Sequence, residues 1–240
     1  MTTDDKLTFI CAVAVQAEIE ALVPQFTRQS GIAVEVNYDV NPAVARRVID
    51  GEDFDVGLSN PWFVDEMIAR GRIHSDIHVP FGRVPLAIGA VGSEPGEIVR
   101  TRETIYELLA DAESIAYTSI GTSGKTFLRA IELLGLQEQL RDRLRPMGAA
   151  EPPIAAAQGL VQYAIAPLSR IIAAPGVAPV AIFPPDMSLN IDMSMFVHKD
   201  SRREMALQLI QFLSASELDD YLRTRGVCRY ELHDERAFAS

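Results

Sequence analysis

The feature that most constrains the fold is an alternation of short apolar runs with helical patterns in the first third of the chain. Leu7–Val13 is an apolar run rich in strand-forming residues, and from Gln16 apolar residues recur at helical spacing through Phe26. Two further strand–helix pairs begin near Ile32 and Phe54. Strands that alternate with helices favour a parallel sheet with helices on both faces, so the sequence predicts an α/β protein.

The pattern changes after Gly71, and this change predicts a second lobe. RVPLAIGAVG has the character of one continuous buried strand, and we place a crossing between lobes there. The strings ESIAYTS, GLVQYAIAP, VAPVAIFPP and NIDMSMFVH predict later strands, one of which returns the chain to the first lobe. REMALQLIQFLSASELDDYLRTRG predicts a final helix. The expected boundaries are residues 1–84 for the first part of lobe 1, 85–192 for lobe 2, and 193–240 for the return to lobe 1.

Composition excludes several classes of protein. The chain has 240 residues, of which 48% are hydrophobic, so a disordered chain is excluded. The formal net charge of −11 disfavours a nucleic-acid partner, because phosphate binding requires a basic stripe. The N-terminal sequence has acidic residues where a secretory signal has basic ones, and its apolar run is too short to cross a bilayer. We therefore expect no membrane insertion, and a chain that is either cytoplasmic or already trimmed of an export signal.

Neither the cysteines nor the histidines predict a metal site. Cys11 and Cys228 lie far apart in the sequence, and we expect both to be ordinary half-buried residues. His74 and His78 have the four-residue spacing of a helical metal pair, but their segment lacks helical periodicity and ends at Pro80. We expect a solvated loop there, and neither a metal nor a cofactor.

Ligands of parallel α/β sheets bind outside the carboxyl ends of the strands. The first three strand ends are followed by Ala14 and Val15, by Asn41, and by Asn60. Both asparagines precede a proline, which makes them good candidates for helix N-caps. Their side chains are also expected to face the ligand edge of the sheet, so all four residues are candidate ligand contacts.

A second candidate site is the string GTSGKT, which lies between a predicted strand and a helix. A phosphate loop requires a glycine where this chain has Ser119, so a nucleotide site is disfavoured. The free N–H groups of Thr122, Ser123 and Gly124 at the start of a helix nevertheless suit a carboxylate or an oxyanion. The alternative is a simple N-cap formed by Thr122 or Ser123.

Arg83 stands directly before the apolar strand at the predicted lobe crossing. A guanidinium at that place can fork onto a carboxylate or an oxyanion, which makes Arg83 a candidate ligand contact. The alternative is an exposed arginine with a structural role.

Four strings, in this order, resemble the type II periplasmic binding proteins, in particular their molybdate-binding-like branch: AEIEALVPQFTRQSGIAVEV, VARRVIDGEDFDVGLSN, SIAYTSIGTSGKTFLRAIELLGL, and PLSRIIAAPGV with IFPPDM. The resemblance implies two α/β lobes, each with a mixed, mostly parallel sheet flanked by helices, and two crossing strands that form a hinge. It also implies a ligand between the lobes, hinge closure, a periplasmic location, a monomer, and an ABC importer membrane component as partner.

In the molybdate-binding branch, hydroxyl groups and backbone N–H groups after the first and second strands hold the oxyanion, together with a hydroxyl from the second lobe. The corresponding positions here are Ala14, about Asn41, and Ala166 with Pro167. Each lost hydroxyl contact removes about 1 kcal/mol of net stabilisation. A small organic carboxylate, held by Arg83 and the 122–124 helix start, therefore fits the donors at least as well as molybdate.

Three functional hypotheses follow from these observations. The first is a solute-binding protein for a small oxyanion or organic carboxylate. The second is an isomerase of a di- or tricarboxylate, similar to the aconitate isomerase of this branch, with Lys125 or Tyr38 as the base. The third is an intracellular ligand sensor that acts through a partner protein.

Overall fold

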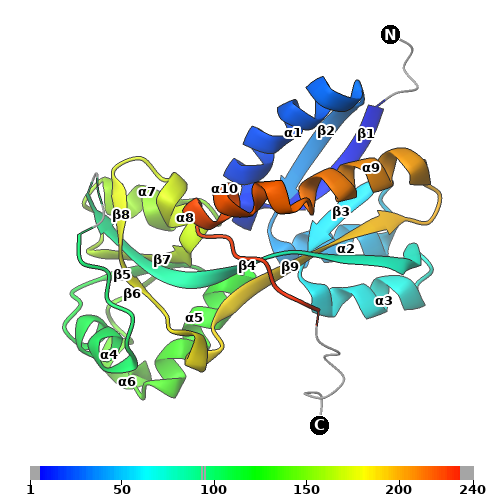
Figure 1. The fold of residues 1–240 in the computed structure, drawn as a ribbon. Coiled ribbons are helices and arrows are strands. Elements are labelled where there is room, and N and C mark those ends of the chain that lie inside the picture. Colours follow the sequence, from blue (N-terminus) through cyan, green and yellow to red (C-terminus); the bar gives the residue numbers. More distant parts are fainter. Residues whose placement is uncertain (1–5, 93, 95, 233–240) are drawn as a thin grey trace. The chain divides into compact units, whose positions relative to one another are not determined.

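The computed structural model describes residues 6–232 except 93 and 95, so the acidic N-terminal residues and the end of the predicted return segment lie outside it. The chain divides into two compact units (Figure 1). Unit 1 contains the chain up to Arg83, Asp192–Thr224, and the chain from Cys228, and unit 2 contains Val84–Ile191 and Arg225–Val227. The sequence does not predict the membership of Arg225–Val227 in unit 2.

The sheet of unit 1 has the strand order β2-β1-β3-β9-β4. The strands are β1 (Lys6–Ala12), β2 (Ala33–Asp39), β3 (Val56–Ser59), β4 (Ile73–Val91) and β9 (Asn190–His198). β1 pairs in parallel with both β2 and β3, whereas β3 and β9 are antiparallel. The carboxyl ends of β1, β2 and β3 therefore lie at one edge of the sheet.

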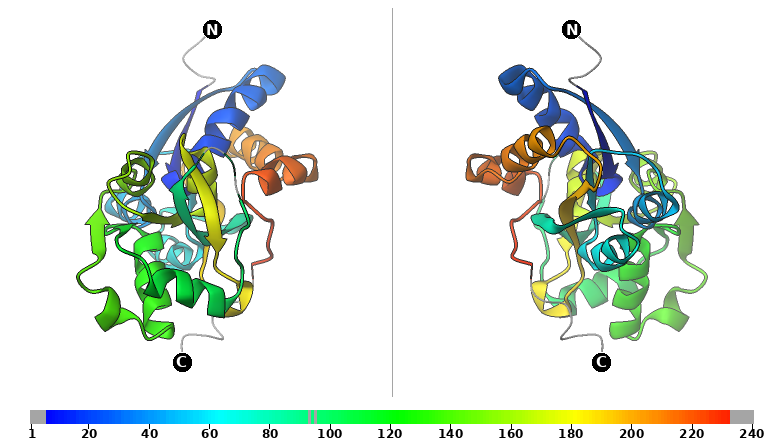
Figure 2. Two further views of the ribbon diagram at one scale, coloured as in Figure 1. Left: turned by 90° about the vertical axis from the view of Figure 1, so that its left-hand side faces the viewer. Right: turned by 90° about the vertical axis from the view of Figure 1, so that its right-hand side faces the viewer.

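Helices flank this sheet, and α1, α2 and α3 each follow one of its three parallel strands. They are α1 (Gln16–Ser30), α2 (Asn41–Asp50), α3 (Val64–Ala69), α9 (Arg203–Leu213) and α10 (Asp219–Thr224), with 3-10 turns at Val13–Val15, Pro61–Phe63 and Ser216–Leu218. α2 and α3 pack around an apolar cluster that includes Ile10, Met67 and Phe196. α1 and α9 lie side by side, where the rings of Phe26 and Phe212 are 5.6 Å apart (Figure 2).

The sheet of unit 2 has the order β4-β7-β5-β6, and β8 also pairs with β4. Its further strands are β5 (Ile115–Thr118), β6 (Leu144–Met147), β7 (Tyr163–Pro167) and β8 (Val177–Ile182). Its helices are α4 (Arg102–Ala110), α5 (Thr122–Leu133), α6 (Gln137–Leu140), α7 (Glu151–Ala157) and α8 (Leu168–Ala173), with a 3-10 turn at Pro185–Met187. β5 is parallel to β6 and β7, and β4 is antiparallel to β7 and β8.

These two mixed sheets with their flanking helices confirm the predicted α/β class. The single helix predicted over residues 203–226 is wrong, because the segment forms α9, a 3-10 turn and α10. The break has a physical cause. The Ser214 hydroxyl donates to the Ile210 carbonyl at 2.7 Å, and Arg229 donates to the carbonyls of Leu213 and Ala215, so the end of α9 is satisfied without a further helical turn.

The solvated loop expected around His74 and His78 is also wrong, because both residues lie in β4. The buried side chains at the start of this strand are Ile73 and Ile77, four residues apart, so the period of two that marks a half-buried strand is absent. No helix among residues 6–232 described here is long and apolar enough to cross a membrane.

Candidate functional site

The carboxyl edge of the unit 1 sheet brings together four of the predicted site residues. Ala14 and Val15 lie in the 3-10 turn after β1, Asn41 begins α2 directly beyond β2, and Asn60 follows β3. All four residues are buried. Because β1 pairs in parallel with both β2 and β3, these residues gather at one edge, as the sequence predicts.

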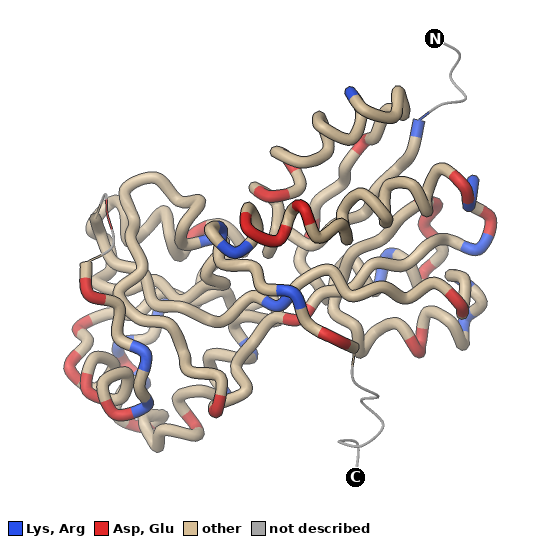
Figure 3. Tube along the Cα trace, viewed as in Figure 1, with Lys and Arg blue, Asp and Glu red and all other residues tan. Residues whose placement is uncertain are grey.

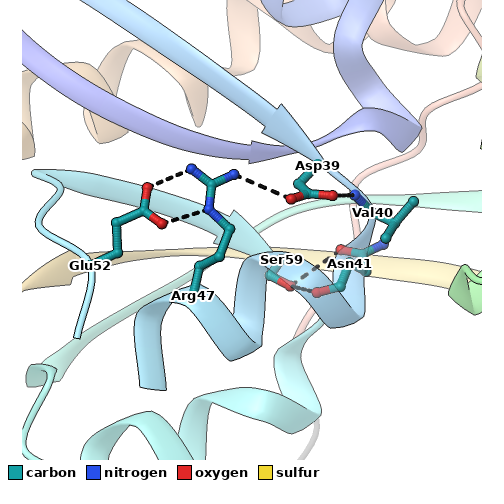
Figure 4. Close-up of polar contacts among 6 residues, drawn as sticks. All are labelled: Asp39, Val40, Asn41, Arg47, Glu52 and Ser59. Atoms are coloured by element: carbon teal, nitrogen blue, oxygen red, sulfur yellow. Dashed lines mark hydrogen bonds and ion pairs between the residues drawn. The ribbon is translucent and has the colours of Figure 1, made fainter. Parts of the chain in front are cut away.

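Asn41 is held by β3 and does not cap its own helix. The N-cap of α2 is Val40, and no side chain makes a capping hydrogen bond there, so the predicted capping role of Asn41 is wrong. The Ser59 hydroxyl lies 3.2 Å from the Asn41 carbonyl oxygen and 3.3 Å from its Oδ1 (Figure 4). The Asn41 side chain does not act as the cap of α2, and the helix starts with Pro42 in its first turn, a position that suits proline.

An ion-pair network fixes the connection between β2 and α2. Arg47 donates to both carboxylate oxygens of Glu52, at 2.6 and 2.5 Å, and to Asp39 at 3.3 Å (Figure 4). Asp39 in turn accepts a hydrogen bond from the Val40 N–H at 2.8 Å. The hydrogen bonds from Arg47 lower the pKa of Glu52. The segment that leads into Asn41 is therefore held by charge-assisted contacts.

Asn60 is held in a similar way by β9. Its Nδ2 donates to the Asp192 carbonyl at 2.7 Å. Asn60 occupies the N-cap position of the turn Pro61–Phe63, but its side chain makes no capping hydrogen bond, so its predicted capping role is also wrong. Two amides and one hydroxyl, all buried, thus stand at the strand ends in orientations set by the protein.

Arg83 forms an ion pair within unit 1. Its Nε and Nη2 donate to the two carboxylate oxygens of Asp192, each at 2.6 Å. The Tyr230 ring lies 5.2 Å from the guanidinium carbon, and the Arg83 main chain exchanges two hydrogen bonds with Cys228. The hydrogen bond to Asp192 raises the pKa of Arg83. The predicted fork onto a carboxylate therefore exists with a protein carboxylate as its acceptor, and a ligand contact of Arg83 stays a prediction.

The other predicted contacts lie in unit 2, at the start of α5. Gly121 is the N-cap and no side chain makes a capping hydrogen bond, so the alternative of a cap by Thr122 or Ser123 is wrong. A Cβ on Gly124 would lie 1.6 Å from the Thr118 carbonyl oxygen, so the first turn of α5 packs directly on the end of β5. Only glycine allows this approach of helix to strand.

A buried group of ionisable side chains near the unit 1 edge is a feature that the sequence analysis misses. Cys11 on β1 lies opposite Tyr38 on β2, and Glu18 in the first turn of α1 is 1% exposed. Burial, followed by the neighbouring acidic groups, raises the pKa of both Cys11 and Tyr38. The sequence does contain a signal for this buried group, because Glu18 falls four residues before Leu22 on the apolar face of its helix.

This group changes two expectations. The raised pKa of Tyr38 disfavours the phenolate, so its predicted role as a catalytic base is disfavoured. The expectation that both cysteines are half-buried is wrong, because Cys11 is fully buried and Cys228 is exposed. Within the described part of the chain, no three His, Cys, Asp or Glu side chains are grouped to hold a metal ion.

Comparisons with known proteins agree with the fold. The family model described as bacterial extracellular solute-binding protein matches residues 7–227. An aconitate isomerase from Pseudomonas sp. is 22% identical over 228 residues, which cover 92% of this chain and 87% of that protein.

Two solved structures illustrate the shared fold. The periplasmic molybdate-binding protein of Azotobacter vinelandii aligns with a TM-score of 0.79 at 18% identity, covering 94% of this chain and 100% of that one. The sulfate-binding protein of Mycobacterium tuberculosis aligns with a TM-score of 0.73 at 16% identity, covering 98% and 90%.

Proposed function

This chain belongs to the family of bacterial extracellular solute-binding proteins, and on that premise we propose that it captures a small anion at the carboxyl edge of the unit 1 sheet. The observation that carries the proposal is the set of buried polar side chains there. Asn41, Ser59 and Asn60 are each oriented by a protein hydrogen bond. Donors fixed in advance bind an anion without a further ordering cost.

The acidic charge of the chain is compatible with this function. Both signs of charge occur in each unit, and segments of Lys and Arg are interspersed with acidic segments (Figure 3). Anion capture therefore rests on local dipoles and amide donors, which dominate the field at short range. In unit 2, we propose the start of α5 as an anion contact made through backbone N–H groups.

The class of anion follows from the donors and from the relatives. Solved structures with this fold are named for molybdate and sulfate, and a relative is named for aconitate. Ala14 offers no hydroxyl at the end of β1, which favours an organic carboxylate over an oxyanion that needs donors on every side. We propose delivery to an ABC importer membrane component in the periplasm, by a monomer.

The test is a thermal stabilisation screen with molybdate, tungstate, sulfate, citrate and trans-aconitate, followed by calorimetry. We expect Asn41→Ala and Asn60→Ala to weaken binding of the best anion by about 10- to 150-fold, the effect of one lost hydrogen bond to a charged group. Asn37→Ala is the matched control, because Asn37 lies within β2 and before its carboxyl end. Stabilisation by none of these anions would overturn the proposal.

The isomerase hypothesis keeps one specific observation in its favour. Glu18 is a buried carboxyl in the first turn of α1, beside the proposed anion site, and helical side chains lean toward the helix N-terminus. A carboxylate in such a place can act as a proton-transfer base. Lys125, on α5 in unit 2, stays a predicted base.

Incubation with trans-aconitate in deuterated water, followed by NMR, separates the two functions. Deuterium uptake into the ligand that Glu18→Gln abolishes supports an isomerase. Binding without any deuterium uptake or isomer formation contradicts it and leaves the binding function in place.

A further inference from the structure

The chain connects the two units by more than the two crossing strands that the family resemblance implies. β4 leaves unit 1 after Arg83, and β9 enters unit 1 at Asp192. A further connection follows α10: Thr224 lies in unit 1, Arg225–Val227 in unit 2, and Cys228 again in unit 1. This connection has little slack, because each of its few residues spans at most about 3.5 Å.

The connection is anchored in unit 2 by close packing on α8. Gly226 has a φ of +78°, and a Cβ at this position would lie 2.6 Å from the Cγ of Leu168, the first residue of α8. A side chain larger than hydrogen therefore fits neither the backbone conformation nor the space. The next residue, Val227, is 1% exposed. The main chain of the connection is thus held against unit 2.

The connection is anchored in unit 1 directly after it returns there. Arg229 donates a hydrogen bond to the Asp219 carboxylate at 2.8 Å. It also donates to three main-chain carbonyls of unit 1, those of Phe81, Leu213 and Ala215. All four contacts are charge-assisted, and the Arg229 side chain is 24% exposed, so they hold the segment firmly. Residues 225–230, which are anchored in both units, are called the strap below.

The strap and both crossing strands are joined at Arg83. The main chain of Arg83 exchanges two hydrogen bonds with Cys228, at 2.7 and 2.9 Å. Its guanidinium donates to both carboxylate oxygens of Asp192 and lies over the Tyr230 ring. Arg83, Asp192 and Cys228 are the unit 1 residues at which β4, β9 and the strap meet the boundary. All three connections are therefore tied together on the unit 1 side.

We propose that the strap limits the relative movement of the two units and thereby tightens capture of the anion. Each further connection of fixed length between two bodies excludes some of their relative orientations, just as closing a loop restricts a chain. The consequence for affinity rests on the proposed function, in which both units contribute contacts to the anion.

The step from movement to affinity follows from populations. A ligand held by both units binds only the molecules in which both sets of contacts are in place, and the apparent Kd is the intrinsic Kd divided by that fraction. Because the strap excludes other orientations, it raises this fraction in the ligand-free protein. Loss of the strap should weaken anion binding by about 3- to 10-fold.

The sharpest test lengthens the strap and removes none of its contacts. One variant carries Gly-Ser-Gly-Ser inserted after Thr224 and again after Val227, which adds up to about 14 Å of reach at each place. The matched control carries the same insertions after Gly31 and after Gly159, where the chain stays within one unit. A Cβ on either of these glycines would meet no atom within 4 Å, so both places have room for an insertion.

Double electron–electron resonance between two spin labels measures the movement in ligand-free protein. The labels are attached through Arg28→Cys on α1 of unit 1 and Glu132→Cys on α5 of unit 2, both at exposed positions. Cys228→Ser removes the exposed native thiol in every variant, whereas Cys11 is buried. We expect the strap insertions to broaden the distribution of label-to-label distances and the control insertions to leave it unchanged.

A point substitution tests the unit 2 anchor by itself. Gly226→Ala places a Cβ against Leu168 and should broaden the distance distribution in the same way. Gly159→Ala is its matched control, because Gly159 has a φ of +68° and no atom within 4 Å of its Cβ. Calorimetry with sulfate and with trans-aconitate should show the 3- to 10-fold weaker binding in both strap variants and in neither control.

The outcomes separate the inference from the function on which it rests. An unchanged distance distribution in the strap-insertion variant would overturn the inference, and so would equal broadening in its control. Broadening with an unchanged anion affinity would contradict the claim that the strap tightens capture. If neither anion binds the wild type, the proposed function fails for these anions, whereas the distance measurement still decides whether the strap limits movement.

Discussion

The two strand-end regions of this protein present their polar groups in different ways. In unit 1, the groups are side chains: the Asn41 and Asn60 amides and the Ser59 hydroxyl, each held by a neighbouring strand or helix. In unit 2, they are main-chain groups at the start of α5, where Gly124 packs on the Thr118 carbonyl. Side-chain truncations should therefore weaken ligand binding in the first region, whereas at the start of α5 only changes that alter the main chain should have large effects.

The largest expected effect tests the close packing in unit 2. Gly124→Ala places a Cβ 1.6 Å from the Thr118 carbonyl oxygen, a main-chain atom that moves only with its strand. We expect a loss of about 3–5 kcal/mol in the free energy of unfolding, measured by urea denaturation. Gly96→Ala is the control, because its Cβ would meet no atom within 4 Å. Equal stability of the two variants would show that the start of α5 does not need its glycine.

The next effect tests how firmly the unit 1 network is held. Arg83→Ala leaves the Asp192 carboxylate, 16% exposed, without its bidentate partner. We expect a loss of about 1.5–3 kcal/mol, below the full range for buried pairs because the Arg83 side chain is 39% exposed. Arg141→Ala breaks an exposed pair with Glu138 and should cost less than about 0.5 kcal/mol. A small and equal change in the free energy of unfolding of both variants would show that the Arg83–Asp192 pair does not stabilise unit 1.

A smaller effect concerns pH and is confined to unit 1, which contains both His78 and His198. Burial lowers the pKa of each. Below the ordinary histidine pKa of about 6.5, the unfolded chain therefore binds more protons than the folded one. The free energy of unfolding should fall as pH drops through this value and stay constant above it. The double variant His78→Gln, His198→Gln should flatten this slope, and an unchanged slope would contradict the assignment.

The smallest effect returns to unit 2 and its backbone donors. Ser123→Ala should change the affinity for the best anion by less than about twofold, because the proposed contact uses main-chain N–H groups. Thr122→Pro removes one of those donors, and the extended Gly121 before it suits a proline. It should weaken binding by about tenfold while the melting temperature is kept. The reverse order of effects would assign the contact to the serine hydroxyl.

Much of this organisation could be predicted from local patterns. The residues after the first three strands, such as Asn41 and Asn60, follow from strand–helix alternation alone, since parallel strands must end at one edge. The start of α5 follows from a glycine-flanked string between a strand and a helix. The first part of β4 could not be predicted, because its buried isoleucines are four residues apart.

By itself, the sequence determined the α/β class, the first three strand–helix pairs and which of their strand ends carry polar residues, because these depend on short-range periodicity and on prolines and glycines. Only the tertiary structure decided what each polar group contacts. Arg83 meets Asp192 across 109 residues, and His78 meets Ser194 across 116. Such partners are set by strand order and register, which no local pattern encodes.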